Sequence, residues 1–313
     1  MSDEPTILVV GSINMDLVVR APHIPAPGET VLGDAFATAP GGKGANQAVA
    51  VARQGVRCLF LGRVGEDDFG RTLLRGMAVE GIDCSAVAKT PGAATGVAMI
   101  IVDARGENSI VVASGANYRV SPSDVCAHED LFEAADVVLL QLELPLPTVM
   151  AARALAVRHG CKVVLDPAPA PKVLPPELCQ VDVISPNVGE AEIITGQHAD
   201  ELDERVHKVV ASDLIARGAK AAVLKLGSRG SLVLTADGQI AVACPYKVNI
   251  VDTTAAGDAF TATLAVGIAR GVPLAHAAQV ANAAGALACT RFGAQPSMPT
   301  SEEIRALMAE QKP

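Results

Sequence analysis

The sequence is poor in aromatic residues and has no long apolar stretch. Its 313 residues include no Trp, two Tyr and six Phe, which disfavours a surface that stacks nucleic-acid bases on aromatic rings. No apolar run reaches the ~20 residues that a membrane helix needs. The acidic N-terminal segment leads directly into an apolar strand, unlike a signal peptide. We therefore expect a cytoplasmic protein with no membrane partner.

Clusters of basic residues and of metal-ligating residues are also absent from the sequence. The formal net charge is −9 and no stripe of Lys and Arg is present, so nucleic acid is not an expected partner. The six His residues lack H-E-x-x-H or any similar spacing, which argues against a zinc site. The seven Cys residues are dispersed without a C-x-x-C pair, which indicates free thiols in a reducing compartment.

Short apolar segments alternate with longer amphipathic segments along most of the chain. The predicted buried strands are Ile7–Val10, Cys58–Leu61, Val137–Leu140, Lys162–Leu165, Val181–Ser185 and Ala221–Leu226. The predicted helices are 44–54, 70–80, 146–159, 188–196, 201–217, 258–270, 275–289 and 301–311. This alternation predicts a mostly parallel central sheet covered by helices on both faces, in a three-layer α/β/α fold. Ligands should bind beyond the carboxyl ends of its strands.

Two segments depart from this alternation. Residues 14–40 alternate polar and apolar side chains among several prolines, and residues 95–114 resemble a hairpin joined by Ala104-Arg105-Gly106-Glu107. We interpret both as inserts that form a small β-sheet lid over the strand ends. Because no repeat or linker divides the chain, we expect residues 1–313 to form a single domain.

The segment Asp252-Thr253-Thr254-Ala255-Ala256-Gly257-Asp258 carries the most chemical information. Its small residues allow several backbone N–H groups to point at one anion at the start of a helix, with Asp258 beside that anion. An anion site with an adjacent carboxylate suits phosphoryl transfer to a hydroxyl group. Alternatively, Asp258 is an ordinary N-cap of a helix.

A glycine-rich segment, Gly41-Gly42-Lys43-Gly44-Ala45-Asn46, precedes another predicted helix. Paired glycines let a ligand approach the backbone, and Asn46 offers both a donor and an acceptor. The segment is not a Walker A motif, because Gly44 follows Lys43 where Ser or Thr is required. A flexible loop that only begins the helix is the alternative.

Three further polar residues follow predicted strands. Asn14 and Asp16 lie two residues apart on an extended segment, so they share one side and could bind adjacent sugar hydroxyls. Glu143 lies just beyond Val137–Leu140, where a ligand group is expected. Turn formation for the first two and a solvated loop position for Glu143 are the alternatives.

Two predicted strands end in segments suited to a nucleotide. Asn187 and Glu190 begin a helix after Val181–Ser185, where Glu190 acts either as a partner of the helix dipole or through water on Mg²⁺ near phosphates. The turn Lys225-Leu226-Gly227-Ser228-Arg229-Gly230 is typical of a nucleotide contact or of an ordinary hairpin.

Together these segments resemble the ribokinase branch of the ribokinase/phosphofructokinase-B family of sugar kinases, over essentially the full length of the chain. Gly41–Asn46 and Asp252–Asp258 are similar to the two family signatures. The intervening matches are Asp166-Pro167-Ala168-Pro169-Ala170, Pro186-Asn187, Leu226–Gly230 and Gly293-Ala294-Gln295-Pro296-Ser297. Departures include Thr263, where Gly or Ala is usual, and Lys225, where Thr is common.

The resemblance implies a homodimer built through the lid and ATP-dependent phosphorylation of D-ribose at O5. It implies Asp258 as catalytic base and the amides of Ala255, Ala256 and Gly257 as an anion hole. The implied sugar ligands are Asn14, Asp16, Gly42, Lys43, Asn46, Glu143 and Asp258. The implied ATP ligands are Asn187, Lys225, Leu226, Gly227, Ser228, Arg229, Gly230, Gly257 and Asn282.

Two metal ions follow from the same resemblance. Mg²⁺ would enter with ATP and contact Glu190 through water. An activating K⁺ ion would be held beside the anion hole by Asp252, Thr254, Ala288, Arg291, Gly293 and Ser297. Three alternatives stay open: a kinase for another pentose such as 2-deoxyribose, a nucleoside kinase, or a catalytically silent sugar sensor.

Overall fold

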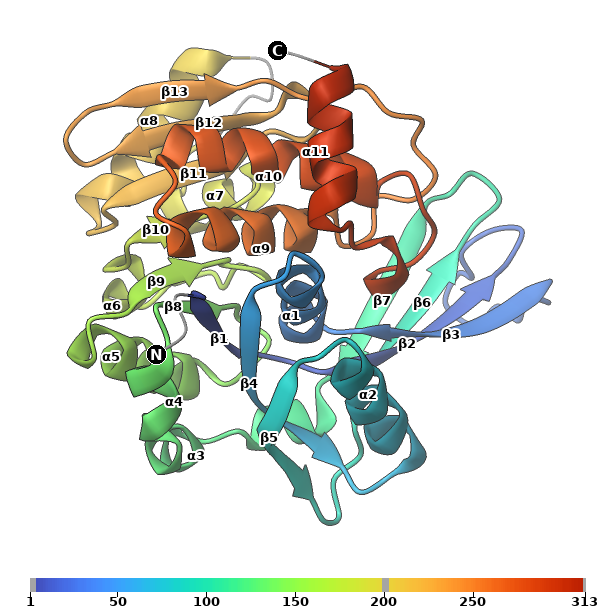
Figure 1. The fold of residues 1–313 in the computed structure, drawn as a ribbon. Helices are drawn as coiled ribbons and strands as arrows, with labels where there is room; N and C mark the ends of the chain where they lie inside the picture. The colour runs from blue at the N-terminus through green and yellow to red at the C-terminus, as the bar shows by residue number, and fades with distance from the viewer. Residues whose placement is uncertain (1–3, 199–202, 312–313) are drawn as a thin grey trace.

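A nine-stranded sheet forms the middle layer of the computed structural model, which describes residues 4–198 and 203–311 (Figure 1). From one edge to the other, its strands are β13 (Ile240–Ala243), β12 (Ser231–Thr235), β11 (Ala221–Lys225), β10 (Val183–Ile184), β9 (Lys162–Leu165), β8 (Val137–Leu140), β1 (Thr6–Val10), β4 (Arg57–Gly65) and β5 (Asp83–Thr90). The strands from β11 to β5 are parallel, whereas β12 and β13 form an antiparallel edge.

Helices cover both faces of this sheet, because successive strand residues point to opposite sides. In β1, Ile7 and Val9 pack into one apolar core and Leu8 and Val10 into the other. The first face carries α1 (Lys43–Arg53), α2 (Asp68–Val79), α9 (Ala256–Ala269) and α10 (Leu274–Ala288), with α11 (Ser301–Glu310) packed on α10. The second face carries α3 (Pro122–Ala127), α4 (Glu129–Ala134), α5 (Leu146–Arg158), α6 (Pro176–Cys179), α7 (Val188–Thr195) and α8 (Glu204–Ala216). The three-layer α/β/α fold is therefore confirmed.

All eight predicted helices are present, with ends that differ by a few residues. The predicted helix 201–217 is observed as α8, and its first two positions lie outside the described residues. The predicted strand Val181–Ser185 is shorter, because only Val183 and Ile184 pair with β9 and β11 in β10. Within the described ranges, no helix is long and apolar enough to cross a membrane.

A second, four-stranded sheet projects from the main body (Figure 1). Its order is β3 (Ala35–Gly41), β2 (Asn14–Arg20), β6 (Gly96–Val102) and β7 (Asn108–Ala113). All four strands come from the two segments predicted as inserts, and β6 and β7 form the expected antiparallel hairpin. Asn14 begins β2 and Gly41 ends β3, so this small sheet reaches the carboxyl end of β1.

Candidate active site

The predicted site residues converge at the carboxyl ends of the parallel strands. Asn14 and Asp16 follow β1, Glu143 follows β8, and Lys225 ends β11. The N-termini of α1 and α9 meet at the same edge, and side chains of these two helices are hydrogen bonded to one another. Strands of one parallel sheet present their carboxyl ends together, which explains why residues so far apart in sequence become neighbours.

Asp258 lies in the first turn of α9 and is 4% exposed. Its Oδ2 accepts a hydrogen bond from Asn46 Nδ2 at 2.9 Å, and its Oδ1 accepts one from Gln47 Nε2 at 3.2 Å. Burial raises the pKa of Asp258 to about 6, and the positive charge of Lys43 opposes this shift. The carboxylate is thus held by two amides from α1. Asp258 is not the N-cap of its own helix, because Ala255 occupies that position.

The start of α9 is open to an anion. No side chain caps this helix, so its first backbone N–H groups lack the usual side-chain acceptor. The preceding residue, Ala255, has φ 59°, and it is the one non-glycine residue with positive φ among the described residues. A non-glycine residue in this region costs about 1–2 kcal/mol, so the surrounding structure must hold the turn in place.

Two of the predicted sugar ligands, Asn14 and Asp16, are buried near the first turn of α1. Asn14 is 3% and Asp16 is 8% exposed. Burial, together with the charges of Glu143 and Asp258, raises the pKa of Asp16 to about 7. Asn46 Oδ1 is buried and accepts no hydrogen bond from any described residue. An unpaired buried acceptor is costly, and a ligand hydroxyl would satisfy it.

Two glycines of the glycine-rich segment allow this close packing. A Cβ added to Gly41 would lie 2.3 Å from Asp16 Oδ2. One added to Gly42, where φ is +89°, would lie 2.7 Å from the backbone nitrogen of Asn14. Side chains at these positions would therefore displace the two predicted sugar ligands.

Lys43 and Glu143 complete the polar wall of the site. Glu143 Oε2 accepts a hydrogen bond from the backbone N–H of Lys43 at 3.1 Å and another from the Ser12 hydroxyl. Burial disfavours the charged Lys43 ammonium, but the negative charges of Asp258 and of three further carboxylates outweigh burial and raise the pKa of Lys43. These three are Asp166, Glu143 and Glu190. Lys43 is therefore a permanent cation among several carboxylates.

Asn187 and Glu190, two residues predicted to lie near the nucleotide, form a reciprocal capping box at the start of α7. Asn187 Oδ1 accepts from the Glu190 N–H, and Glu190 Oε2 accepts from the Asn187 N–H, both at 2.8 Å. In the part of the chain that the structure describes, no cluster of three or more His, Cys, Asp or Glu residues could hold a metal ion. The single carboxylate of Glu190 at this position suits a Mg²⁺ ion that is held mainly by phosphates and water.

The turn 225–230 joins β11 to β12 as a hairpin that contains a 3-10 turn, Gly227–Arg229. Lys225 Nζ points inward and forms an ion pair with Asp166 Oδ1 at 2.9 Å. Asn282, on α10, donates its side-chain amide to the carbonyls of Ala243 and Cys244 at 3.0 and 3.2 Å. Hairpin geometry and a nucleotide contact are compatible here.

Asp252 links two of the loops that were predicted to hold potassium. Its Oδ1 accepts hydrogen bonds from the backbone and hydroxyl of Thr254, and its Oδ2 accepts one from the N–H of Gly293 at 2.9 Å. The Ser297 hydroxyl donates to the carbonyl of Ala294 at 2.7 Å, and Arg291 pairs with Glu303. Ala288 is buried at the end of α10. The Asp252 carboxylate therefore joins the loop before α9 to the loop at Gly293.

Three buried polar residues of the site were not predicted. Gln47 donates from Nε2 to both Asp258 and Asp166, and Asn117 donates from Nδ2 to Asn14 Oδ1 at 2.7 Å. Asp166 follows β9 as Glu143 follows β8, so the same position at a strand end could have indicated it. Asn117, in a 3-10 turn (Gly115–Arg119), carries no comparable signal in the sequence.

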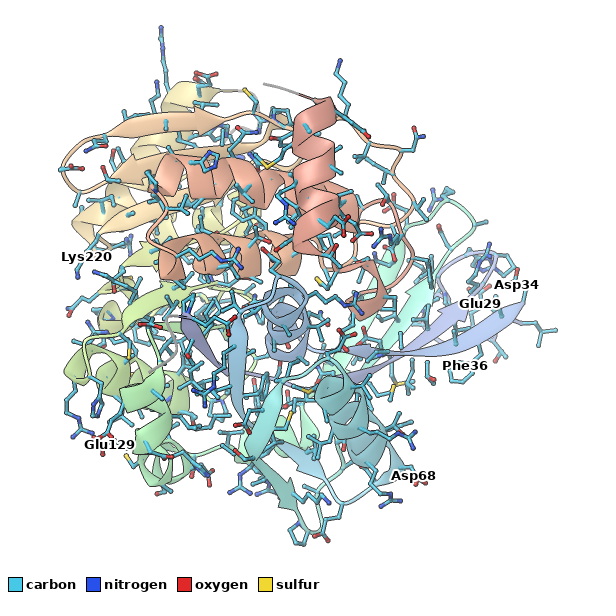
Figure 2. All side chains as sticks on the ribbon, viewed as in Figure 1. Glu29, Asp34, Phe36, Asp68, Glu129 and Lys220 are labelled. Carbon is cyan, nitrogen blue, oxygen red and sulfur yellow. The ribbon has the colours of Figure 1, made fainter. Side chains whose placement is uncertain are left out.

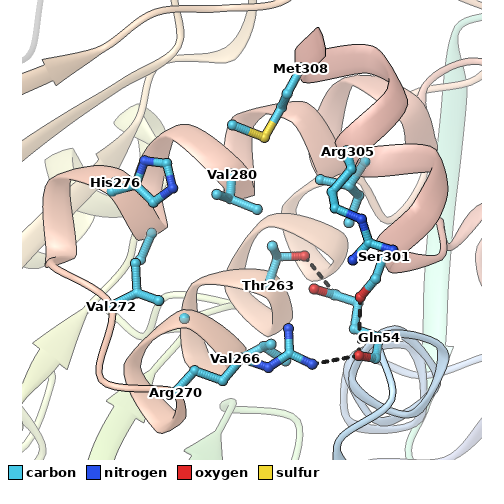
Figure 3. A pocket seen from close by; sticks show the side chains of 13 residues that line it. Gln54, Thr263, Val266, Arg270, Val272, His276, Val280, Ser301, Arg305 and Met308 are labelled. Atoms are coloured by element: carbon cyan, nitrogen blue, oxygen red, sulfur yellow. Dashed lines mark hydrogen bonds between the residues drawn. The ribbon is translucent and has the colours of Figure 1, made fainter.

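A cavity lies elsewhere, on the side of α9 that faces α10 and α11 (Figure 3). It has a volume of about 340 Å³ and lies between α9, α10 and α11. At its floor, Gln54 Nε2 donates to Thr263 Oγ1 at 2.8 Å, and Arg270 donates to the Gln54 carbonyl. The unusual Thr263 therefore ties α9 to the end of α1.

Comparison with known proteins gives the family of this chain. The sequence model of the family described as "pfkB family carbohydrate kinase" matches residues 4–301 of this chain. The ribokinase of Haemophilus influenzae is 40% identical over 299 residues, covering 95% of this chain and 96% of that protein. A Salmonella typhimurium deoxyribokinase is 36% identical, covering 95% and 97%. The structure of Arabidopsis thaliana ribokinase complexed with ribose and ATP superposes with a TM-score of 0.90 at 31% identity, covering 97% of this chain and 99% of that one. The chain therefore belongs to the pfkB family of carbohydrate kinases.

Proposed function

We propose that this ATP-dependent carbohydrate kinase phosphorylates D-ribose at O5 and releases D-ribose 5-phosphate and ADP. The single observation that carries the proposal is the position of Asp258, a buried carboxylate beside the uncapped start of α9. Asn14, Asp16 and Asn46 lie around it with the donors and acceptors that hydroxyl groups require. The Arabidopsis thaliana ribokinase with ribose and ATP bound supports the same substrates.

In the proposed mechanism, Asp258 orients the O5 hydroxyl and accepts its proton. O5 then forms a bond to the γ-phosphorus while the bond from that phosphorus to the bridging oxygen of ADP breaks. The backbone N–H groups of Ala255, Ala256 and Gly257 stabilise the charge on the transferred group, and the dipole of α9 acts in the same direction. The Lys43 ammonium adds a fixed positive charge at the acceptor side.

The nucleotide would bind across the ends of β10 and β11. Asn187, the turn Lys225–Gly230 and Asn282 would contact ATP, with the phosphates directed to the N-terminus of α9. Glu190 would hold a water molecule of the Mg²⁺ ion through its carboxylate. When bound with ATP, that ion neutralises phosphate charge and lowers the cost of bringing the acceptor oxygen close.

A kinase for 2-deoxyribose is the main alternative, because a deoxyribokinase is among the similar proteins. Asp16 beside Asn14 favours a sugar with a 2-hydroxyl group, since a buried carboxylate needs donors to accept from. A coupled assay of ADP release with ribose, deoxyribose, fructose, adenosine and uridine tests the proposal. We expect the highest kcat/KM with ribose. A higher kcat/KM with another acceptor would reassign the substrate. If none of the five acceptors leads to ADP release, a sugar sensor would be favoured.

Potassium is proposed as an activator that acts from outside the active site. Asp252 already joins the loop before α9 to the loop at Gly293, and an ion held there by Asp252 and neighbouring carbonyls would rigidify the anion hole. We expect several-fold faster turnover in K⁺ than in Na⁺, because the smaller ion fits carbonyl ligands less well. Initial rates of wild type and Asp252→Asn in both salts measure this, and the variant should lose the difference. Equal rates of the wild type in both salts would remove the potassium site.

The small sheet is proposed as a lid that also joins two copies of the chain. Every residue of β7 is exposed, including Ile110 at 52% and Val111 at 66%, and Phe36 stands out on β3 (Figure 2). Adjacent exposed apolar residues on an edge strand are rare in monomers. Residues 1–313 would then form one domain, with the lid as an insert in it.

Substitution of Ile110 tests the dimer directly. We expect Ile110→Glu to convert a dimer into a monomer, because a charge would be buried between the two lids. Light scattering after size-exclusion chromatography measures the mass. Val79→Glu, at an exposed apolar residue on α2, is the matched control and should stay dimeric. A monomeric wild type would contradict the proposal.

We propose a cytoplasmic location because the cysteines are free thiols. All seven are free, and Cys126 and Cys244 are exposed. Exposed free thiols persist in a reducing compartment.

A further inference from the structure

A buried network links the proposed catalytic base to a second carboxylate. Gln47 Nε2 donates to Asp166 Oδ2 at 2.9 Å and to Asp258 Oδ1 at 3.2 Å. Gln47 Oε1 accepts from Gln141 Nε2 at 2.5 Å, which fixes the orientation of the amide. Because a carbonyl oxygen would repel two carboxylates, the opposite orientation is excluded. One NH₂ group therefore holds both acids.

Two buried carboxylates that share one donor repel each other, and Lys225 offsets this. Asp166 is 1% exposed, and its Oδ1 accepts from Lys225 Nζ at 2.9 Å. Thr261 Oγ1 lies 3.4 Å from both Lys225 Nζ and Asp166 Oδ2. Without this ammonium, the charge of Asp166 would act on Asp258 through a medium that screens it poorly.

The position of Lys225 also connects the network with the anion hole. Its Nζ lies 3.6 Å from the point that a Cβ on Gly257 would occupy. An ammonium has three donors, and Lys225 Nζ donates to Asp166 and Thr261. One donor is left beside the backbone where the transferred phosphoryl group would lie.

Resting on the proposed function, we propose that Asp166, Lys225 and Gln47 form a positioning network that balances the charge beside Asp258 and keeps this base ionised at neutral pH. Asp166 and Gln47 act through Asp258, so they are positioning residues. The network does not depend on which sugar is the substrate.

The other charged groups that face Asp258 come from three further elements. Lys43 on α1 favours its ionised form, whereas Glu143 after β8 and Asp16 on β2 disfavour it. All three are present in every variant below, so changes in the pH profile report on Asp166 and Lys225. The sign is fixed by chemistry: a higher pKa of Asp258 moves the acid limb of the pH profile to higher pH.

The test is the dependence of kcat on pH at saturating sugar and ATP, from about pH 5 to about pH 9, because saturation removes the effect of Asp16 on sugar binding. We expect Lys225→Met to move the acid limb up by about one pH unit, because Asp166 loses its counter-charge. Asp166→Asn should move the limb down. The double variant Asp166→Asn/Lys225→Met, which removes both charges, should return it close to the wild-type position. Lys220→Met, an exposed lysine just before β11, is the control and should leave the limb in place (Figure 2).

A change in the KM for ATP alone in Lys225→Met, with an unmoved acid limb, would overturn the network and leave Lys225 as a nucleotide contact. A second readout needs no substrate: thermal unfolding at about pH 8 of the wild type, the single variants Lys225→Met and Asp166→Asn, and the double variant. We expect Lys225→Met to lower Tm and the double variant to recover it. If Tm recovers in the double variant but the wild type has no kinase activity, the proposed function is wrong and the network stands. If the losses of Tm in the two single variants are additive in the double variant, the network is wrong.

Discussion

Asp258→Asn is expected to lower kcat by about 10²–10⁴-fold and to leave the affinity for the sugar largely unchanged. The amide can still contact the acceptor hydroxyl, but it cannot take the proton. The two amide donors that hold the carboxylate, Asn46 and Gln47, keep one oxygen to contact. Steady-state kinetics with saturating ATP measures kcat, and titration calorimetry of the sugar measures its affinity.

Loss of folding does not explain such a result, because the charge of Asp258 is unfavourable in the folded protein. Burial raises the pKa of Asp258 from 3.8 to about 6. A raised folded-state pKa contributes stability that is present below about pH 4 and lost as the pH rises through about 6. At about pH 8 the variant should therefore have a Tm no lower than that of the wild type. Asp68→Asn, at an exposed acid that begins α2 (Figure 2), is the control for both measurements. Near-normal turnover of Asp258→Asn would contradict its role as base.

Asp16→Ala is expected to lower kcat/KM for the sugar by about 10²-fold or more, mainly through KM. Without the Asp16 carboxylate, the sugar hydroxyl groups lose their buried hydrogen-bond acceptor, and the sugar is no longer held in the correct position. The variant should also discriminate less between ribose and deoxyribose, because the carboxylate is the proposed partner of the 2-hydroxyl group. Rates with both sugars in wild type and variant give the ratio of kcat/KM values.

The pH dependence of sugar affinity gives an independent check on Asp16. Because the pKa of Asp16 is raised to about 7 in the free protein, its ionised form is lost as the pH falls below that value. Sugar affinity should therefore weaken in the wild type between about pH 8 and about pH 6, and Asp16→Asn should lose this dependence. An unchanged ratio of the two sugars in Asp16→Ala, with full activity, would place the 2-hydroxyl contact elsewhere.

The parts of the fold that the sequence predicted are those with a strong local pattern. Apolar runs such as Val137–Leu140 and the turn-rich hairpin around Ala104–Glu107 have short-range signals, and the structure confirms both elements. The strands β5, β12 and β13 were missed. β5 and β13 are edge strands that are largely unburied, and the apolar run of β12, Leu232–Leu234, is only three residues long.

The site shows the same division. Gly41–Asn46 and Asp252–Asp258 have local glycine and small-residue patterns that indicate a ligand near the backbone. The roles of Gln47, Asp166 and Asn117 depend on contacts between residues about 100 or more positions apart, such as Gln47 with Asp166. A buried amide and a surface amide are the same letters in a sequence, and only the folded chain distinguishes them.

A crystal structure with ribose and a non-hydrolysable ATP analogue is the most direct measurement of the central claim. We expect O5 of the sugar within hydrogen-bonding distance of Asp258, on a line with the γ-phosphorus, and the phosphate oxygens at the N–H groups that begin α9. A sugar bound with O5 directed away from Asp258, or phosphates bound away from α9, would contradict the assignment of base and anion hole together.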